Sequence, residues 1–277
     1  MALRLEEAGL EYRVFDDAAP TGASRNAAGI CKLSWYRQET VRKMIDGVFT
    51  YAEFMRGFSW LADRVAIAKV PERFVNAGRG TEKVHDDNYL ADPAELLGLG
   101  RVMTTPVDKL YHDRNRVVVH TPDEGDFYCS QVVVAAGVGT DKLLADSGLG
   151  APTGVQPLWG RAMLFDCAEP PVCTTVMTRP YRHYTFREFR GRVRGGDTVE
   201  RGERNDKHMD DLFVAAARLF GELSDVTVFG GIRPVCRRMY VGRVSPQVIA
   251  ATGGHRVGFG LAGAVSERVF ELLGTSP

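Results

Sequence analysis

The stretch Gln131-Val-Val-Val-Ala-Ala-Gly-Val-Gly139 decides the fold that this sequence predicts. After Gln131, the stretch continues as an uninterrupted apolar run to Ala136 that is rich in β-branched side chains, as a strand buried on both faces requires. The run ends in a glycine turn at Gly137 and Gly139. We therefore expect a parallel strand in the middle of a sheet that is covered on both faces.

The amino end adds a helix and a second strand to this sheet. Residues 1–8 have a helical pattern stopped by Gly9, and the apolar run 10–15 reads as a short strand with Asp16 at its tip. A helix, a glycine turn and a strand ending in an acid form the second half of a βαβ unit, whose first strand is absent. Asp16 stands where such a unit places an acid that binds a ribose hydroxyl, although an Asp pair followed by Ala-Pro is also an ordinary turn.

The region between these two strands mixes helices and strands. Apolar residues recur every three or four positions over 38–61, which predicts one long packed helix. An Asp cap and an early proline predict a short helix over 92–99. Short strands are expected in five places, namely 65–70, 73–75, 102–107, 117–120 and 127–129.

After residue 150 the pattern changes to strands separated by turn residues, at 162–165, 174–178, 184–189 and 192–195. This predicts a separate antiparallel sheet. The next elements expected are a helix over 206–223, a strand at 226–229 and a Gly-Ile-Arg-Pro turn. The chain then continues with a strand at 248–251, a glycine-rich turn and a last helix near 264–273. We expect an α/β protein of two interleaved lobes. Residues 1–150 form the nucleotide-binding lobe, although part of 38–100 could belong to the second lobe. Residues 151–229 form mainly the second, antiparallel lobe, and 230–277 return to the first.

Composition excludes several classes of function. The 35 basic and 35 acidic residues cancel, so net charge gives no case for binding nucleic acid or a membrane surface. The five cysteines have neither CxxC spacing nor an even-numbered framework, which argues against a zinc site or a secreted disulfide scaffold. No apolar stretch approaches the length of a membrane-spanning helix. We expect a protein of the cytoplasm that holds no metal and binds a small ligand.

The segment Thr21-Gly-Ala-Ser-Arg-Asn-Ala-Ala-Gly-Ile30 has the composition of a cofactor-binding loop. Its small residues allow backbone amides to approach a pyrophosphate or a flavin edge closely. A surface loop without ligand would have the same composition, so the segment alone leaves both readings open.

Four segments, in the correct order, resemble the D-amino-acid oxidase and glycine oxidase family of flavoproteins. They are the segment 21–30, the run Val132-Val-Val-Ala-Ala-Gly-Val-Gly139, the segment Gly231-Ile-Arg-Pro-Val-Cys-Arg-Arg-Met-Tyr-Val-Gly242, and Gly253-Gly-His-Arg-Val-Gly-Phe-Gly260. The resemblance implies a Rossmann-like FAD-binding lobe interleaved with an antiparallel-sheet substrate lobe. The FAD-binding residues that it implies are Asp16, Ser24, Arg25, Asn26, Ala27, Gly29, Ile30, Val107, Ala136, Gly137, Gly254, His255, Arg256, Val257, Gly258, Phe259 and Gly260.

The resemblance also implies three residues that hold the substrate. Arg233 would receive the substrate carboxylate, and a planar guanidinium suits this because it forms two parallel hydrogen bonds; bracing the two lobes is the alternative. Tyr181 and Tyr184 fall where the family has an active-site strand with tyrosines, although packing explains such aromatics equally well. His255 is expected to shape a glycine turn and not to act as a base, because in this family the flavin itself accepts the hydride.

The chain departs from the family at its amino end. There a strand and a Gly-x-Gly-x-x-Gly turn precede the first helix, whose amino terminus holds the FAD pyrophosphate. In this sequence that helix comes almost first. The explanations are a start codon placed too late, which we favour, a first strand supplied by another chain, or a homologue that no longer binds flavin.

The function expected from the resemblance is FAD-dependent oxidation of a small amine that bears a carboxylate, such as a D-amino acid, glycine or an N-substituted glycine. Hydride would pass to the flavin and water would hydrolyse the imine. Two alternatives remain. The chain could be a non-catalytic or partner-completed flavoprotein, or its substrate could be a glycine-like group on a macromolecule, which the arginines at 187, 190, 192 and 194 could serve.

Overall fold

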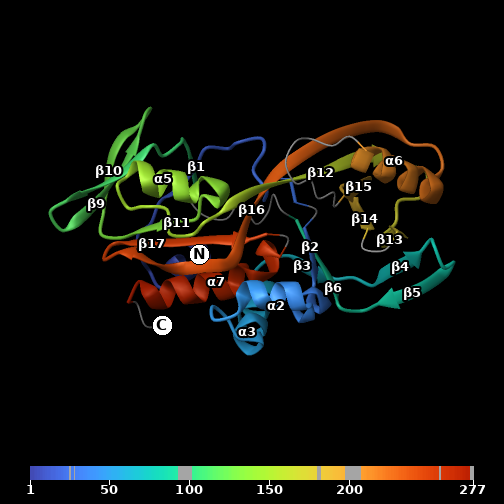
Figure 1. The fold of residues 1–277 in the computed structure, drawn as a ribbon, viewed down its shortest axis with the longest axis horizontal. Helices are drawn as coiled ribbons and strands as arrows, with labels where there is room; N and C mark the ends of the chain where they lie inside the picture. Colours follow the sequence, from blue (N-terminus) through green and yellow to red (C-terminus); the bar gives the residue numbers. More distant parts are fainter. Residues whose placement is uncertain are drawn as a thin grey trace.

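Two long neighbouring strands, β12 (Gln156–Asp166) and β16 (Ser224–Ser245), connect the two ends of the molecule (Figure 1). The computed structural model describes residues 1–24, 26–27, 29–92, 102–179, 182–196, 207–255 and 257–274. Both strands belong to a mixed nine-stranded sheet with the order β11-β17-β16-β12-β15-β14-β13-β4-β5. The expected α/β class with two lobes is confirmed, and the antiparallel strands are part of this one sheet instead of a separate one.

The predicted turn at Gly-Ile-Arg-Pro is wrong, because these residues lie inside β16. Arg233 pairs with Leu158 and Pro234 with Pro157 across the antiparallel ladder to β12. Proline has no N–H, but an antiparallel ladder alternates with pairs that exchange no hydrogen bonds, so two prolines can face each other there. A single strand therefore crosses the expected lobe boundary at residue 229, and the three boundaries stay predictions.

The strand predicted from the opening stretch is β11 (Val132–Val134), and it runs parallel to β17 (Val248–Gly254). It leads through the short 3-10 helix η2 (Gly137–Gly139) into α5 (Thr140–Asp146). The carboxyl-terminal helix α7 (Gly258–Leu272) packs along β16 and β17, as Figure 1 shows. This end of the molecule has the strand, glycine turn and helix arrangement of a nucleotide-binding sheet.

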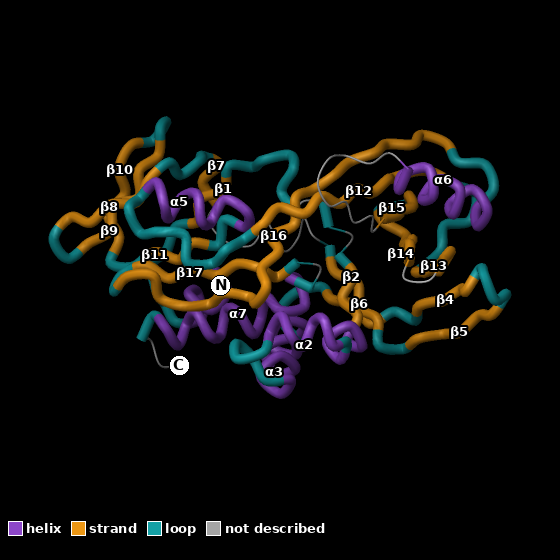
Figure 2. The backbone as a smooth tube through the Cα atoms, viewed as in Figure 1, coloured by secondary structure: helices purple, strands orange, loops and turns teal. Residues whose placement is uncertain are grey.

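The amino-terminal helix and strand are also present, as α1 (Ala2–Glu7) and β1 (Val14–Asp16). β1 pairs in parallel with β7 (Val102–Thr104), and the two form a small sheet of their own. A three-stranded antiparallel sheet lies beside this part of the molecule (Figure 2). Its strands are β8 (Lys109–Asp113), β9 (Arg116–Thr121) and β10 (Gly125–Cys129).

The long helix predicted over 38–61 is in fact two helices, α2 (Glu39–Ile45) and α3 (Tyr51–Ala62). The chain breaks at Gly47, which has a φ of 73° that few other residues adopt. Thr50 then starts α3 with a capping box, in which its hydroxyl accepts from the Glu53 amide. The apolar spacing continues through the break, so the sequence periodicity alone did not predict that the helix would end there.

The structure contains several strands that the sequence did not predict, or predicted with other bounds. A second three-stranded sheet has the order β2-β6-β3, and a polar hairpin forms the edge of the main sheet. The strands concerned are β2 (Ile30–Lys32), β3 (Ile67–Lys69), β4 (Glu72–Asn76), β5 (Thr81–His85) and β6 (Asn88–Ala91). The 3-10 helix η1 (Leu33–Arg37) follows β2. The helix predicted over 92–99 lies almost wholly outside the described residues.

The substrate-lobe end of the sheet has one apolar face. It consists of β13 (Cys173–Arg179), β14 (Arg182–Phe189) and β15 (Arg192–Gly196), together with the ends of β12 and β16. Helix α6 (Lys207–Phe220) covers this face and forms a core with it. The opposite face carries polar and charged side chains and is turned toward β2 and the loop before it.

In the part of the chain that the structure describes, no helix is long and apolar enough to span a bilayer.

Candidate functional site

The loop that precedes β2 lies against β16. Thr21 accepts a backbone hydrogen bond from Ile232 at 2.9 Å, and Gly22 forms a parallel bridge with Ile232. A Cβ on Gly231 would stand 3.1 Å from the Cβ of Asn26 and 3.2 Å from the Cα of Ala23. The absence of a side chain at position 231 therefore lets the two segments approach, and the sequence motifs 21–30 and 231–242 meet in space.

The loop keeps its shape through its own polar groups. The side chain of Asn26 donates to the carbonyls of Pro20 at 2.6 Å and Gly22 at 3.0 Å. Ser24 is exposed, Ala27 is half-buried and Gly29 is buried. Asn26 thus positions the loop backbone, a role that requires no ligand.

The turn after β11 approaches the same place on β16 and β17. Thr252 donates its hydroxyl hydrogen bond to the Gly137 carbonyl at 2.9 Å. A Cβ at Gly137 would stand 4.0 Å from the Cγ of Pro234. Ala136, just before the turn, is exposed, so its surface is open to a ligand.

The fourth motif closes the site from the side of α7. His255 has a φ of 44° and donates its amide to the Pro234 carbonyl at 3.1 Å, which fits the expected role of shaping a turn. Val257 is buried and its carbonyl accepts from the Tyr36 hydroxyl at 3.0 Å. Gly258, exposed, and Phe259, half-buried, open the helix, and Gly260 is buried beneath the ring of Tyr36. The four motifs therefore meet around the middle of β16.

Arg233 lies on the face of the main sheet that the loop before β2 covers. Its guanidinium crosses over Gly160 of β12, where an added Cβ would stand only 2.6 Å from Nη1. The side chain of Arg233 is half-buried. A glycine in a central strand costs stability, so its presence here indicates that the guanidinium needs this space.

The other predicted site residues are distributed unevenly. Tyr184 is 3% exposed and packs in the core beneath α6, on the face opposite Arg233, which favours the packing interpretation. Asp16 accepts from the Ala18 amide at 2.7 Å, as an ordinary turn residue does. Val107 is half-buried beside the β9–β11 core, and Ile30 begins β2. Arg25, Tyr181 and Arg256 lie outside the described residues.

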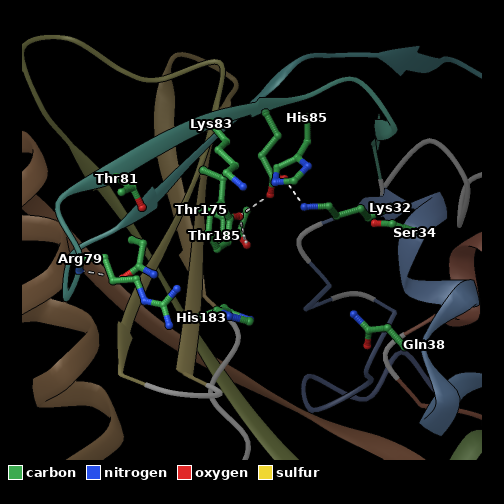
Figure 3. Close-up of a pocket in the computed structure, with 13 residues that line it drawn as sticks. Lys32, Ser34, Gln38, Arg79, Thr81, Lys83, His85, Thr175, His183 and Thr185 are labelled. Atoms are coloured by element: carbon green, nitrogen blue, oxygen red, sulfur yellow. Dashed lines mark hydrogen bonds and ion pairs between the residues drawn. The ribbon is translucent and has the colours of Figure 1, made fainter.

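A cavity of about 410 Å³ opens beside β2, and Figure 3 shows its lining. Buried Lys32 forms an ion pair with buried Glu72, which also accepts from the Thr175 hydroxyl. Lys83 and His183 lie on its rim (Figure 3). The cavity contains none of the four motifs, although Lys32 comes two residues after Ile30. Since Glu72 is already paired, the remaining charge of the lining is positive.

The buried charges that were not predicted as site residues also include Arg187 on β14 and Arg194 on β15. Both appeared in the sequence only as part of an arginine run that could serve a macromolecule. The alternation of strand residues could have found them, because Tyr184 and Phe186 face the core and the odd-numbered residues of β14 face the other way.

The geometry fits FAD at the site's glycine-rich centre. The described residues of segments 21–27, 136–139, 231–235 and 254–260 bring backbone and small side chains together, and Gly231 already accommodates one close backbone approach. Such surfaces allow a planar ring system and its phosphates to approach the main chain. These are the residues that would hold the cofactor.

The large mixed sheet, with four glycine-containing segments gathered around β16, is the framework of a mixed α/β protein. Residues 84–272 match the DAO family of FAD dependent oxidoreductases. The chain belongs to this family.

A D-amino acid dehydrogenase of Bradyrhizobium diazoefficiens is 27% identical over 194 residues, which cover 63% of this chain and 44% of that protein. The fold is similar to that of iminodiacetate oxidase from Chelativorans, with a TM-score of 0.78, 16% identity, and coverage of 99% of this chain and 92% of the other. It is also similar to glycine oxidase from Geobacillus kaustophilus, with a TM-score of 0.77, 17% identity, and coverage of 99% and 90%.

Proposed function

We propose that this chain oxidises a small amine that bears a carboxylate, such as a D-amino acid, glycine or an N-substituted glycine, with FAD as its cofactor. The observation that carries the proposal is the position of Arg233. Its guanidinium lies over Gly160, on the face of the sheet that the loop 21–27 covers. A carboxylate bound there stands beside the glycine-rich centre proposed for the cofactor.

Each part of the site has a defined task in this proposal. Arg233 binds the carboxylate through two parallel charge-assisted hydrogen bonds and so fixes the orientation of the α-carbon. The bound FAD supplies the hydride acceptor. The sheet face and the loop 21–27 limit the access of water to the reacting carbon. His255 holds the turn through its backbone and takes no part in proton transfer.

The relatives support the same substrate class by name. They include proteins that act on D-amino acids, glycine and iminodiacetate, all of which combine an amine with a carboxylate. Because all these substrates carry a carboxylate, a single arginine could bind each of them in the same way.

Arg233 variants test the proposal. Arg233→Lys keeps the charge and loses the two-pronged contact, while Arg233→Ala loses both, so kcat/KM should fall in that order. We expect a loss of about 100-fold or more for Arg233→Ala, as a charge-assisted contact contributes a few kcal/mol. Flavin content, from visible absorbance, should be unchanged. Anaerobic bleaching of the flavin by an amino-acid panel measures the reaction.

The alternative role of Arg233, bracing the two lobes, gives the opposite pattern. The thermal midpoint of Arg233→Ala would then fall strongly, while turnover per folded, flavin-loaded molecule would stay intact. That result would remove the carboxylate-binding assignment.

A further inference from the structure

Two buried cations stand directly opposite each other in the substrate lobe. Arg187 of β14 and Arg194 of β15 are cross-strand partners, with side chains 4% and 6% exposed. Like charges in this arrangement repel each other, and burial strengthens the repulsion. Burial and the neighbouring Arg187 charge together lower the pKa of Arg194 to about 10. The arrangement is costly for the folded protein as it stands.

Aromatic rings offset part of this cost. The guanidinium carbons of Arg187 and Arg194 lie 5.1 and 5.2 Å from the ring centroid of Phe189, and that of Arg194 lies 4.6 Å from the ring centroid of Phe229. All three contacts are within the range of cation–π attraction. A ring face, however, is a much weaker acceptor for an N–H donor than an oxygen atom is.

One hydrogen-bond donor of each guanidinium, the Nε group, has no acceptor within the described residues. Within the described ranges, Nε of Arg187 and Nε of Arg194 are buried and have no acceptor. Arg190 and Arg192, on the same hairpin, are instead paired with Asp92 at 2.9 Å and Asp166 at 2.7 Å. Buried donors are almost always satisfied in folded proteins, so the two Nε groups are donors that an anionic ligand could use.

The pair lies on the same face of the sheet as Arg233. Phe229, Gly231 and Arg233 alternate along β16 and therefore point to one side, and Gly231 contacts the loop at Ala23. Phe229, which Arg194 covers, is two residues from Gly231, a distance of about 7 Å along a strand. On its other side, Arg187 lines a cavity of about 330 Å³ between β14 and β6.

We propose that Arg187 and Arg194 together bind a second carboxylate of the substrate, beside the carboxylate that Arg233 receives, so that the enzyme acts on dianionic amino acids or N-carboxyalkyl amino acids. The inference rests on the proposed function for the position of the first carboxylate. A planar carboxylate can accept from both guanidiniums, whose neighbouring carboxylate, Asp92, is already bound by Arg190 at 2.9 Å.

Redox-inert carboxylates test the inference without turnover. Titration calorimetry on the FAD-loaded protein compares glutarate with pentanoate. Both acids have five carbons, but glutarate has two carboxylates and pentanoate has one. We expect glutarate to bind at least tenfold more tightly. Arg187→Met and Arg194→Met should each abolish this preference and leave pentanoate binding as in the parent protein. Arg187→Lys, which keeps the charge, should retain part of the preference.

Arg73→Gln is the matched control. Arg73 is on the same sheet but pairs with exposed Glu82 at 2.5 Å, away from the site, and its loss should leave both affinities unchanged. The Met variants should also raise the thermal midpoint without ligand, since each removes an unpaired buried charge. Equal binding of the two acids by the parent protein overturns the inference. So does a lower midpoint in the Met variants with the glutarate preference intact.

The Arg233 variants keep the two proposals apart. Weaker pentanoate binding in Arg233→Lys supports the first carboxylate site whatever the glutarate result is. If that variant leaves pentanoate binding unchanged, the proposed function fails independently of Arg187 and Arg194.

Discussion

The space above Gly160 fixes where the Arg233 guanidinium can lie, and this can be tested without changing any charge. Gly160→Ala places a methyl group 2.6 Å from Nη1 and forces the guanidinium to move. Because misplacement of a binding group reduces catalysis sharply, we expect KM for the amino-acid substrate to rise roughly tenfold. Steady-state kinetics and the thermal midpoint measure the effect, and the midpoint should change little.

A double-mutant cycle provides the control for this prediction. In an Arg233→Ala background there is no guanidinium to displace, so adding Gly160→Ala should have no further effect on KM. Independent, additive effects of the two substitutions would show that the methyl group acts on something other than Arg233.

At the residue scale, the sequence predicted which segments lie near one another better than it predicted which sheet face a side chain occupies. The motif residues Gly137 and Gly254 were found by pattern, and both lie beside β16, since Gly137 is near Pro234 and Gly254 pairs with Val235. The orientation of Tyr184, and the burial of Arg187 and Arg194, depend on which sheet face packs against α6. That choice is made by tertiary packing, which a pattern of aromatics and arginines in a strand does not encode.

At the scale of elements, α3 and α7 cross with their backbones in close contact. A Cβ on Gly263 would overlap the carbonyl oxygen of Gly57, and a Cβ on Gly57 would stand 2.7 Å from the Gly263 carbonyl carbon. Backbone contacts this close leave no room for relaxation of a side chain. α7 depends on this crossing for its position, and it begins with the motif residues 258–260.

Gly263→Ala should therefore destabilise the protein, by about 1–3 kcal/mol as overpacking of a core typically does. The matched control is Gly258→Ala in the same helix, which has nothing within 4 Å of an added Cβ. Replacing a helical glycine by alanine at an open position typically stabilises by up to about 1 kcal/mol. Chemical denaturation measures both. Equal effects of the two substitutions would show that the crossing is not a tight contact.

The element boundaries show where sequence periodicity is insufficient. The strand and turn at 131–139 were predictable because a β-branched run and glycines agree locally. The continuous β16 was not, since Pro234 and Gly231 read locally as a turn and only the neighbouring β12 keeps them extended. The polar edge strand β5 carries no apolar alternation, because four of its five residues are exposed.

At the scale of the whole molecule, four segments far apart in the sequence are expected to form one cofactor site. If they do, FAD should reduce amide hydrogen exchange in peptides that cover 21–27, 136–139, 231–235 and 254–260 together, since a ligand bound to all four lowers local opening in each. Peptides from the β4–β5 hairpin serve as the internal reference, because this hairpin lies at the other end of the main sheet from β11 (Figure 1). The measurement is exchange mass spectrometry at increasing FAD concentration, and the protection should saturate with the visible absorbance of bound flavin. Protection confined to a single segment, or spread equally over the reference hairpin, would show that these segments do not act as one site, even though the fold brings them together.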